Sequence, residues 1–371
     1  MQTFYLLSVI VTPFNVYSGT LLSISSLQGK LLFCPTRYPA STRQSLISAF
    51  AEPLNMSLRA EDLQYVVAPM INQSDLPFRA LCVAHGATST YTEMLDPARL
   101  TSDIGYREFH LRSLQLEKAA GLGRPVLVQV QGNDPETVVK GAREIAPWAD
   151  AIDLNLGCPQ KRAREGHYGG YLLPKKDWPL IESVVSAMSH SLTPPTTTKV
   201  RLCNPVSQTP ELCERLIAAG TGLIAIHPRH VAESRRRAGV PDMDAVRLCV
   251  AQIDHAVPVL LNGGTRSFAH LATNRAATGV DGVMVGEAVL DNPLLFEARI
   301  PDPRAVCLEY LGYCEKFEGT ATVYTIKQHV KRFVEYQCVR RPWFGRFGKA
   351  LLECETQEEV RNMLEGDLIA N

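Results

Sequence analysis

The chain has 371 residues, of which 46% are hydrophobic and 20% are charged. This length allows one large domain and a smaller one, and the composition is typical of a globular enzyme. The 38 basic and 38 acidic residues cancel, so the net charge gives no argument for a polyanionic partner. No apolar run reaches the roughly 20 residues that a membrane-spanning helix needs, so we expect no membrane partner.

The first 51 residues contain no Asp or Glu, only three basic residues, and many Ser and Thr. Such a composition resembles an organelle transit peptide. A disordered extension, or an upstream stretch that the cell does not translate, would have the same composition. We therefore assign residues 1–60 to an N-terminal extension, exclude them from the fold, and expect the protein in the cytoplasm or in an organelle.

The chain has 10 cysteines, but they form no C-x-x-C pair and show no Cys/His spacing typical of zinc. A reduced compartment is the simpler interpretation. We expect no metal site.

From about residue 63 onward, short aliphatic and β-branched runs alternate with patterns of helical period. The eight expected strands are 65–69, 89–92, 126–131, 151–156, 198–201, 223–227, 259–262 and 282–285. The expected helices are 75–84, 134–146, 177–189, 207–219, 242–253, 267–277 and 293–298. The interval 96–120 is longer, and we expect an irregular loop there before its helix.

Residues that commonly begin and end helices support these bounds. Asp134, Asp242 and Ser267 stand where a helix N-cap is expected. Gly220 and Gly279 stand where a helix should end. The pattern therefore consists of complete strand-helix units.

Eight strand-helix units favour a parallel sheet that closes into a TIM barrel over residues 61–300, followed by a smaller helical domain over 301–371. An open doubly wound sheet is the alternative. It would place a G-x-G-x-x-G motif after the first strand, and none follows residues 65–69. In a TIM barrel, the C-terminal ends of the strands form the active site.

Polar residues and glycines follow nearly every expected strand. They are Pro69 with Met70, Thr92 with Glu93, Gln129 with Gln131, Asn155 with Cys158, Lys199 with Arg201, His227, Asn262-Gly263-Gly264, and Gly286-Glu287. The glycine turns after the seventh and eighth strands lie where barrel enzymes bind phosphate, which indicates a phosphorylated cofactor. Two ordinary turns that need positive φ would give the same pattern.

Four side chains from alternate units should point to the centre of this face: Gln129, Asn155, Lys199 and His227. Amide, cation and imidazole groups can bind the carbonyls and ring nitrogens of a flavin. Each of them alone could equally be a satisfied polar group. Cys158 is either a packed thiol or a general acid, since a thiol with an ordinary pKa of about 8.5 is protonated at neutral pH.

Basic and aromatic residues alternate over residues 327–349, with Glu335 as the only acid. This pattern suits contacts with phosphates and stacked bases. A helix with a solvated charged face and an aromatic core stripe would show it too. Smaller basic clusters occur at 161–164, 175–176 and 235–237.

Four motifs resemble those of the tRNA-dihydrouridine synthases. They are Val66-Val67-Ala68-Pro69-Met70, Tyr91-Thr92-Glu93-Met94, Asp153-Leu154-Asn155-Leu156-Gly157-Cys158-Pro159-Gln160, and Gly166-His167-Tyr168-Gly169. They occur in order between about Leu63 and Phe296, and the last two resemble the eukaryotic branch of the enzyme 1 type most.

The resemblance implies an FMN-binding TIM barrel, a helical tRNA-binding domain, and NADPH as the reductant. It implies reduction of the uracil 5,6 double bond in the tRNA D-loop, at the nucleotides usually numbered 16 and 17. Cys158 matches the proton donor to C5, opposite hydride delivery from flavin N5 to C6. The residues that match FMN contacts are Pro69, Met70, Gln129, Lys199, His227, Asn262, Gly263, Gly264 and Gly286.

Asn155 matches the uracil-side amide, and we expect Arg201, Lys327, Lys331 and Arg332 to contact the substrate as well. We expect a monomer.

The chain departs from the family pattern at Pro228, Gly170, Glu287 and Met243. Two other functions stay open: an FMN barrel reductase of a free small molecule, similar to dihydroorotate dehydrogenase, and a tRNA-binding protein that has lost catalysis.

Overall fold

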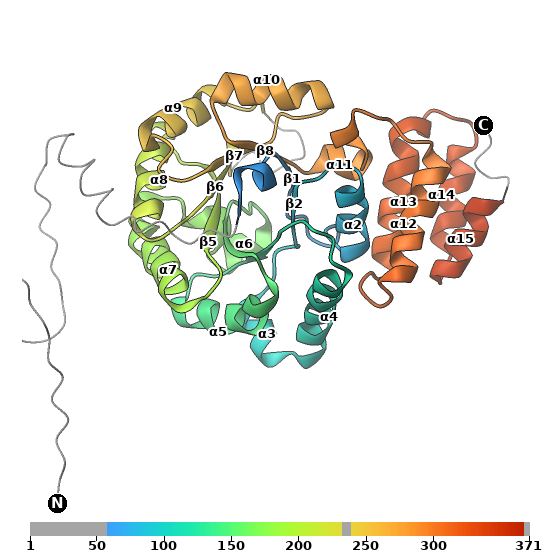
Figure 1. The fold of residues 1–371 in the computed structure, drawn as a ribbon, viewed down its shortest axis with the longest axis horizontal. Coiled ribbons are helices and arrows are strands. Elements are labelled where there is room, and N and C mark those ends of the chain that lie inside the picture. Colours follow the sequence, from blue (N-terminus) through green and yellow to red (C-terminus); the bar gives the residue numbers. More distant parts are fainter. Residues whose placement is uncertain (1–57, 232–238, 367–371) are drawn as a thin grey trace, which may run out of the picture. The chain divides into compact units, whose positions relative to one another are not determined.

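The computed structural model describes residues 58–231 and 239–366 (Figure 1). Most of the expected N-terminal extension and the basic cluster at 235–237 lie outside these residues. The described part begins inside the stretch assigned to the extension, because Leu58 is buried in the interior of the barrel. Among the described helices, none is long and apolar enough to cross a membrane.

Eight parallel strands pair in sequence order and close into a barrel, which confirms the predicted TIM fold. The strands are β1 (Tyr65–Val67), β2 (Ser89–Tyr91), β3 (Val126–Val130), β4 (Ala151–Leu156), β5 (Thr196–Leu202), β6 (Ile224–His230), β7 (Val259–Asn262) and β8 (Gly282–Val285). The pairing of β1 with β8 closes the sheet.

Helices surround the strands as a ring (Figure 1). The barrel helices are α2 (Leu76–Ala84), α3 (Pro97–Ser102), α4 (Ile104–Ala120), α5 (Pro135–Ile145), α6 (Lys161–Glu165), α7 (Trp178–Ser191), α8 (Thr209–Ala218), α9 (Met243–Ile253), α10 (Phe268–Thr278) and α11 (Glu287–Asp291). The C-terminal helices are α12 (Pro303–Lys316), α13 (Val323–Cys338), α14 (Phe344–Glu353) and α15 (Gln357–Glu365). Short 3-10 turns join several of them, among them η1 (Ala60–Leu63) and η6 (Leu295–Glu297).

The side chains inside the barrel change character along its axis, because every second residue of a strand points inward. Apolar residues such as Leu127, Ala151 and Leu260 form one buried cluster in the interior. Two residues further along, Gln129 and Asp153 lie side by side in the register of β3 and β4. The barrel interior is thus filled by apolar side chains nearer the N-terminal ends of the strands and by polar side chains nearer their C-terminal ends.

The N-terminal end of the barrel is closed by η1. A Cβ on Gly282 would lie 1.6 Å from the carbonyl oxygen of Leu63, so only glycine allows this close backbone approach. Leu63 and Leu58 fill the interior next to it. Among the described residues, this end of the barrel is therefore closed to a ligand.

Two of the predicted helix N-caps form the expected side-chain hydrogen bond. Asp134 accepts a hydrogen bond from the backbone of Thr137, and Asp242 accepts one from Ala245. Gly279 ends α10 in the left-handed conformation, with φ of +73°, as expected of a C-cap glycine. Ser267 is the N-cap of α10, as predicted, although its side chain makes no capping hydrogen bond.

Two predicted segments differ from the structure. The interval 96–120 holds no irregular loop, since α3 and α4 are separated only by Asp103, whose side chain caps α4. Residues 293–298 form only the short turn η6, and the helix after β8 is α11. The first prediction rested on the length of the interval and missed the cap at Asp103, and the second rested on a helical pattern that forms only a short turn.

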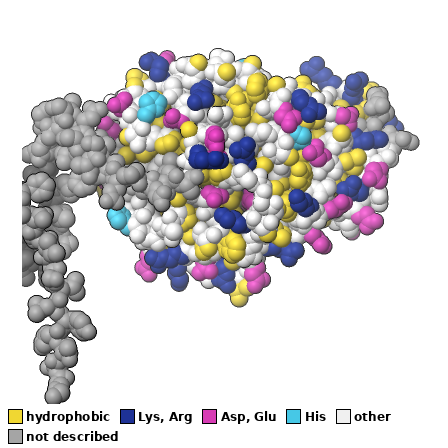
Figure 2. Space-filling model, viewed as in Figure 1, with side chains coloured by type: hydrophobic (Ala, Val, Ile, Leu, Met, Phe, Trp, Pro, Cys, Tyr) yellow, Lys and Arg dark blue, Asp and Glu magenta, His cyan; other side chains and the backbone are white. Residues whose placement is uncertain are grey.

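The helical C-terminal segment packs against α2 and α11 of the barrel, and one hydrophobic cluster extends through both parts. Asp75, the N-cap of α2, accepts hydrogen bonds from His329 Nε2 of α13 at 2.7 Å and from the hydroxyl of Tyr310 in α12 at 3.1 Å. Figure 2 shows cationic and acidic side chains interspersed over the visible face, in line with the zero net charge.

Candidate functional site

A cavity of about 890 Å³ lies at the C-terminal ends of the strands. It brings together every residue that was expected to act in catalysis or to bind the cofactor, with two of those expected on the substrate side. They are Pro69, Met70, Gln129, Asn155, Cys158, Lys199, Arg201, His227, Asn262, Gly263, Gly264 and Gly286. Residues from all eight strands, or from the loops that directly follow them, therefore converge on one space.

Cys158 lies two residues beyond β4, with 8% of its surface exposed. Its backbone is fixed on both sides: its N–H donates to Asn155 Oδ1 at 2.8 Å, and its carbonyl accepts from Gly170 N at 3.1 Å. Burial raises the pKa of the Cys158 thiol above its usual value. The thiol is therefore protonated at neutral pH and available as a general acid.

Tight packing of the loop after α6 holds Cys158 in place. Gly169 has φ of +64°, and a Cβ there would lie 3.0 Å from the Cys158 Cβ. The ring of Tyr168 packs in the same small cluster as Cys158, and its hydroxyl accepts from Arg162 Nε at 2.9 Å. The Gly-His-Tyr-Gly motif thus forms the wall behind the thiol.

A chain of hydrogen bonds beneath the cavity orients these groups. Thr197 donates to Asp153 Oδ1 at 2.7 Å, and Gln129 Nε2 donates to the other carboxylate oxygen at 2.8 Å. Gln129 Oε1 accepts from Asn155 Nδ2 at 2.8 Å, which leaves Asn155 Oδ1 facing the N–H groups of Gly157 and Cys158. Burial raises the pKa of Asp153 to about 6, against the lowering effect of the Thr197 and Gln129 hydrogen bonds.

The neighbouring strands β5 and β6 carry positive charge next to Cys158. Burial, and secondly the charge of Arg201, lowers the pKa of Lys199 to about 8. Burial, followed by Lys199 and Arg201, lowers the pKa of His227 to about 2, so this imidazole is neutral. Arg229 donates to His227 Nε2 at 3.1 Å, which leaves the proton of the neutral ring on Nδ1.

The glycines after β7 have the left-handed conformation, with φ of +124° at Gly263 and +75° at Gly264. Gly286 has φ of −108°, so it does not need positive φ, and a Cβ there would make only ordinary contacts. Asn262 donates to the Met284 carbonyl at 3.1 Å and joins the two strand ends. A turn that needs positive φ therefore explains why Gly263 and Gly264 are glycines, but it does not explain Gly286.

Residues 66–366 match the model of the dihydrouridine synthase family. This chain belongs to that family. It is 29% identical over 330 residues to the tRNA-dihydrouridine(16/17) synthase of Schizosaccharomyces pombe, with 80% of each protein covered. It is 35% identical over 248 residues to a tRNA-dihydrouridine(16/17) synthase-like protein of Mus musculus, with 67% of this chain and 50% of that protein covered. The chain thus spans about half the length of the mouse relative.

The three predicted tRNA-binding cations all belong to α13, and two of them contact other parts of the chain. Lys327 donates to the carbonyls of Leu352 and Cys354, both at 2.8 Å, at the end of α14. Arg332 is only 12% exposed and forms an ion pair with Asp291 of α11 at 2.6 Å. These two charges join parts of the protein to one another, and their expected role in substrate binding stays a prediction. Lys331 is exposed, as expected of a residue that meets RNA.

Sequence reasoning did not assign three residues that line the cavity: Arg229, Arg266 and Tyr336. The two arginines supply cations near the glycine turns, where Glu287 offers none. Tyr336 belongs to α13, so the helical segment contributes directly to the cavity wall. The basic-aromatic pattern of 327–349 contained Tyr336, but only the packing of α13 on α11 brings it there.

The loop after β6 differs from what Pro228 suggested. The strand continues through Pro228 to His230, with a register irregularity opposite Arg201 and Leu202. Arg201 reaches across this irregularity and donates to the His230 carbonyl at 2.8 Å. Pro228 thus lies within β6, and His227 lines the cavity.

Proposed function

We propose that this protein is an FMN-dependent reductase that converts uridine to 5,6-dihydrouridine in the D-loop of tRNA, with NADPH as the reductant. The observation that carries the proposal is a protonated thiol, Cys158, held in the wall of a large cavity that the buried cations Lys199 and Arg201 also line. The names of the relatives and the membership of the dihydrouridine synthase family support it.

The residues of the cavity fit FMN. The left-handed glycines Gly263 and Gly264, together with Gly286, allow the backbone to approach a phosphate closely, and Arg229 and Arg266 lie in the same cavity. Lys199 and neutral His227 are suited to the ring carbonyls and nitrogens of the isoalloxazine. When bound, FMN supplies the hydride that is delivered to C6 of the uracil.

Cys158 completes the reduction by giving its proton to C5, so that the C5–C6 double bond becomes a single bond and a thiolate remains to be reprotonated by solvent. Its backbone hydrogen bonds and the packing of Gly169 fix the position of this donor. Asn155 lies beside the thiol, where its amide can meet the uracil edge. Access to both groups requires the uridine to leave its base stack.

RNA would approach over the rim that the barrel and the helical segment share. Tyr336 offers a ring for stacking, and Lys331 an exposed cation for phosphate. In this proposal the catalytic barrel covers residues 61–300 and the tRNA-binding helices cover 301–371. We also propose that the protein acts as a monomer, which analytical ultracentrifugation with and without tRNA would test.

The test replaces Cys158 by Ala, with Cys249→Ala as the control, because Cys249 is fully buried on α9 away from the cavity. We expect the Cys158 variant to purify with bound flavin and to oxidise NADPH, but to lose at least a hundredfold in dihydrouridine formation, the range of general acid catalysis. Mass spectrometry of unmodified tRNA transcripts measures the product.

Three outcomes would contradict the proposal: a colourless wild-type protein, full activity of Cys158→Ala, or equal loss in Cys249→Ala. Incubation with free uridine and dihydroorotate addresses the small-molecule alternative. Rapid reduction of either compound, with tRNA left unmodified, would favour that alternative.

A further inference from the structure

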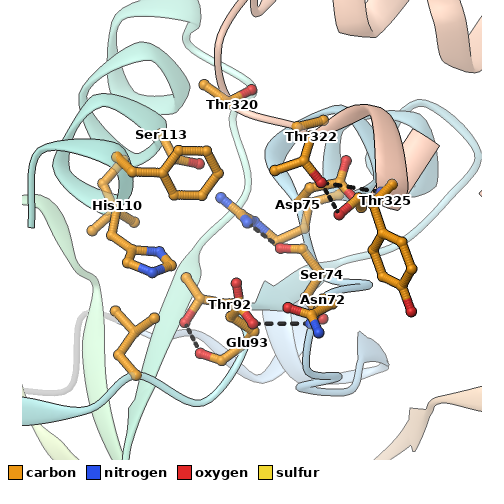
Figure 3. Close-up of a pocket in the computed structure, with 16 residues that line it drawn as sticks. Asn72, Ser74, Asp75, Thr92, Glu93, His110, Ser113, Thr320, Thr322 and Thr325 are labelled. Carbon is orange, nitrogen blue, oxygen red and sulfur yellow. Dashed lines mark hydrogen bonds between the residues drawn. The ribbon is translucent and has the colours of Figure 1, made fainter. Parts of the chain in front are cut away.

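A second pocket lies at the same rim, between the first two strand-helix loops, α4 and the beginning of α13 (Figure 3). It has a volume of about 130 Å³, whereas one water needs roughly 10–15 Å³ of such space. The loop after β1 places Ile71 in the large cavity and Asn72 in this pocket, and the loop after β2 does the same with Met94 and Glu93. The two spaces are therefore neighbours.

The proposal below depends mainly on His110 of α4, a buried histidine. Its side chain is 9% exposed and points into the pocket, as Figure 3 shows. Within residues 58–231 and 239–366, no hydrogen bond satisfies either ring nitrogen; the ring packs in T-shaped pairs with Tyr106 and Phe109. Burial, and secondly the charge of Arg79, lowers the pKa of His110 to about 4, so the ring offers one neutral donor and one neutral acceptor.

Glu93 faces the same space. One carboxylate oxygen accepts from the backbone N–H of Asn72 at 2.9 Å, which ties the two loops together. Burial raises the pKa of Glu93. Its remaining oxygen can accept from an amino or imino group of a ligand.

The charges of the pocket exclude an anionic ligand. Its cation, Arg79, is already held by an ion pair with Glu117 and by the Ser74 carbonyl. Asp75 and Glu93 add acidic groups to the wall. A phosphate of RNA, FMN or NADPH would therefore be repelled here.

We propose that this pocket binds a nucleobase of the tRNA that neighbours the uridine being reduced. The inference rests on the proposed function. His110 and Glu93 present the donors and acceptors that read a base edge, and the rings of Phe109 and the 61%-exposed Tyr324 line the pocket for stacking. Recognition of this neighbour makes the pocket a determinant of which uridine enters the large cavity.

The first test uses the holoenzyme with His110→Phe and Glu93→Gln. Phenylalanine keeps the ring contacts of His110, and glutamine can still accept from Asn72. His190→Phe is the matched control, because His190 is an exposed histidine on α7. We expect the KM for tRNA to rise roughly tenfold in both variants. This rise corresponds to the loss of about 1.4 kcal/mol of binding free energy, as expected for one base contact. Flavin content, kcat and oxidation of NADPH by oxygen should not change. A KM within twofold of that of His190→Phe in both variants overturns the proposal.

A second test does not depend on turnover. In protein labelled with ¹³C at histidine Cε1, the His110→Phe variant identifies the His110 resonance among those of the nine histidines. We expect this resonance to shift on saturation with tRNA and not with inorganic phosphate. If tRNA binds and the His110 resonance stays in place, the pocket proposal fails while the proposed function stands. If tRNA does not bind at all, the proposed function itself fails.

Discussion

At the scale of single residues, Lys199 is a buried cavity residue whose charge changes close to physiological pH. Its pKa of about 8 means that a buried cation is present below this pH and is lost above it. An anionic ligand stabilises the cation and raises this pKa, so binding takes up a proton above pH 8. We therefore expect the affinity of the apoprotein for FMN to fall as the pH rises through 8.

Quenching of flavin fluorescence between pH 6.5 and 9.5 measures this dependence. Lys199→Arg is the control, because a guanidinium stays charged throughout that range and should remove the dependence. His227 has a pKa of about 2 and adds no titration there. A wild-type profile as flat as that of Lys199→Arg would contradict the prediction.

Asp153 allows a second prediction about one residue. As the acceptor for Thr197 and Gln129, it sets the direction of the chain of hydrogen bonds that ends at the N–H of Cys158. Asp153→Asn can keep this direction if the Thr197 hydroxyl turns to accept, whereas Asp153→Leu leaves the buried Gln129 amide without an acceptor, at a cost of about 1–3 kcal/mol. We expect near wild-type activity for Asn and at least a tenfold loss for Leu.

The rate at which bromoacetamide alkylates Cys158 is a second measurement that does not depend on catalytic activity. Circular dichroism checks that both Asp153 variants fold. The Leu variant should show an altered alkylation rate and the Asn variant a normal one. Equal activity and equal alkylation rates in the two variants would contradict a role for the direction of the hydrogen bonds.

Sequence alone identified Cys158, Lys199 and His227 as residues of one site, because strand order and the inward alternation place them on one rim. It could not identify Asp153 as their support. A buried acid on a strand shows nothing of its partners until the register of β3, β4 and β5 is known.

At the scale of secondary-structure elements, Asp75 connects α2 to the C-terminal helices. Burial raises the pKa of its carboxyl most, but the charge of His329 together with hydrogen bonds from His329, Phe78 and Tyr310 outweighs burial, so the pKa is lowered. An acid with a lowered folded-state pKa stabilises the fold above the unfolded value of about 3.9, and this stabilisation is lost as the pH falls through the folded value.

We therefore expect Asp75→Asn to lower the free energy of unfolding by about 2 kcal/mol at pH 7. The difference between wild type and variant should shrink as the pH falls below 4. Urea unfolding at several pH values measures both. A difference that grows on acidification would show that the sign is wrong.

The elements themselves were predictable to within a few residues where caps and periodicity agreed, as at Asp134 and Gly279. The prediction was wrong at 96–120, where Asp103 caps α4 directly after α3. A length argument could not reveal a cap that serves two adjoining helices.

At the scale of the whole molecule, the zero net charge leaves RNA binding to a few positions. Lys331→Glu should weaken tRNA binding and reduce its salt dependence by about one unit of log–log slope, with flavin content unchanged. Arg332→Glu is not a matched change, because it also breaks the ion pair with Asp291. Filter binding at several salt concentrations measures the slope. Unaltered affinity would remove Lys331 from the interface.

The contact between barrel and helices was the part that sequence did not predict. The cations at 327 and 332 looked like RNA ligands, but their partners lie far along the chain, at Leu352, Cys354 and Asp291. Composition reports that a segment is basic. It does not show which of these charged side chains form ion pairs or hydrogen bonds within the folded protein.

Tyr336 has a practical consequence. Because a residue of α13 lines the cavity, the docking of the helical segment and the environment of the proposed flavin are coupled. A tyrosine ring close to an isoalloxazine quenches its emission, so the bound cofactor would serve as a built-in optical reporter of whether α13 is seated on the barrel.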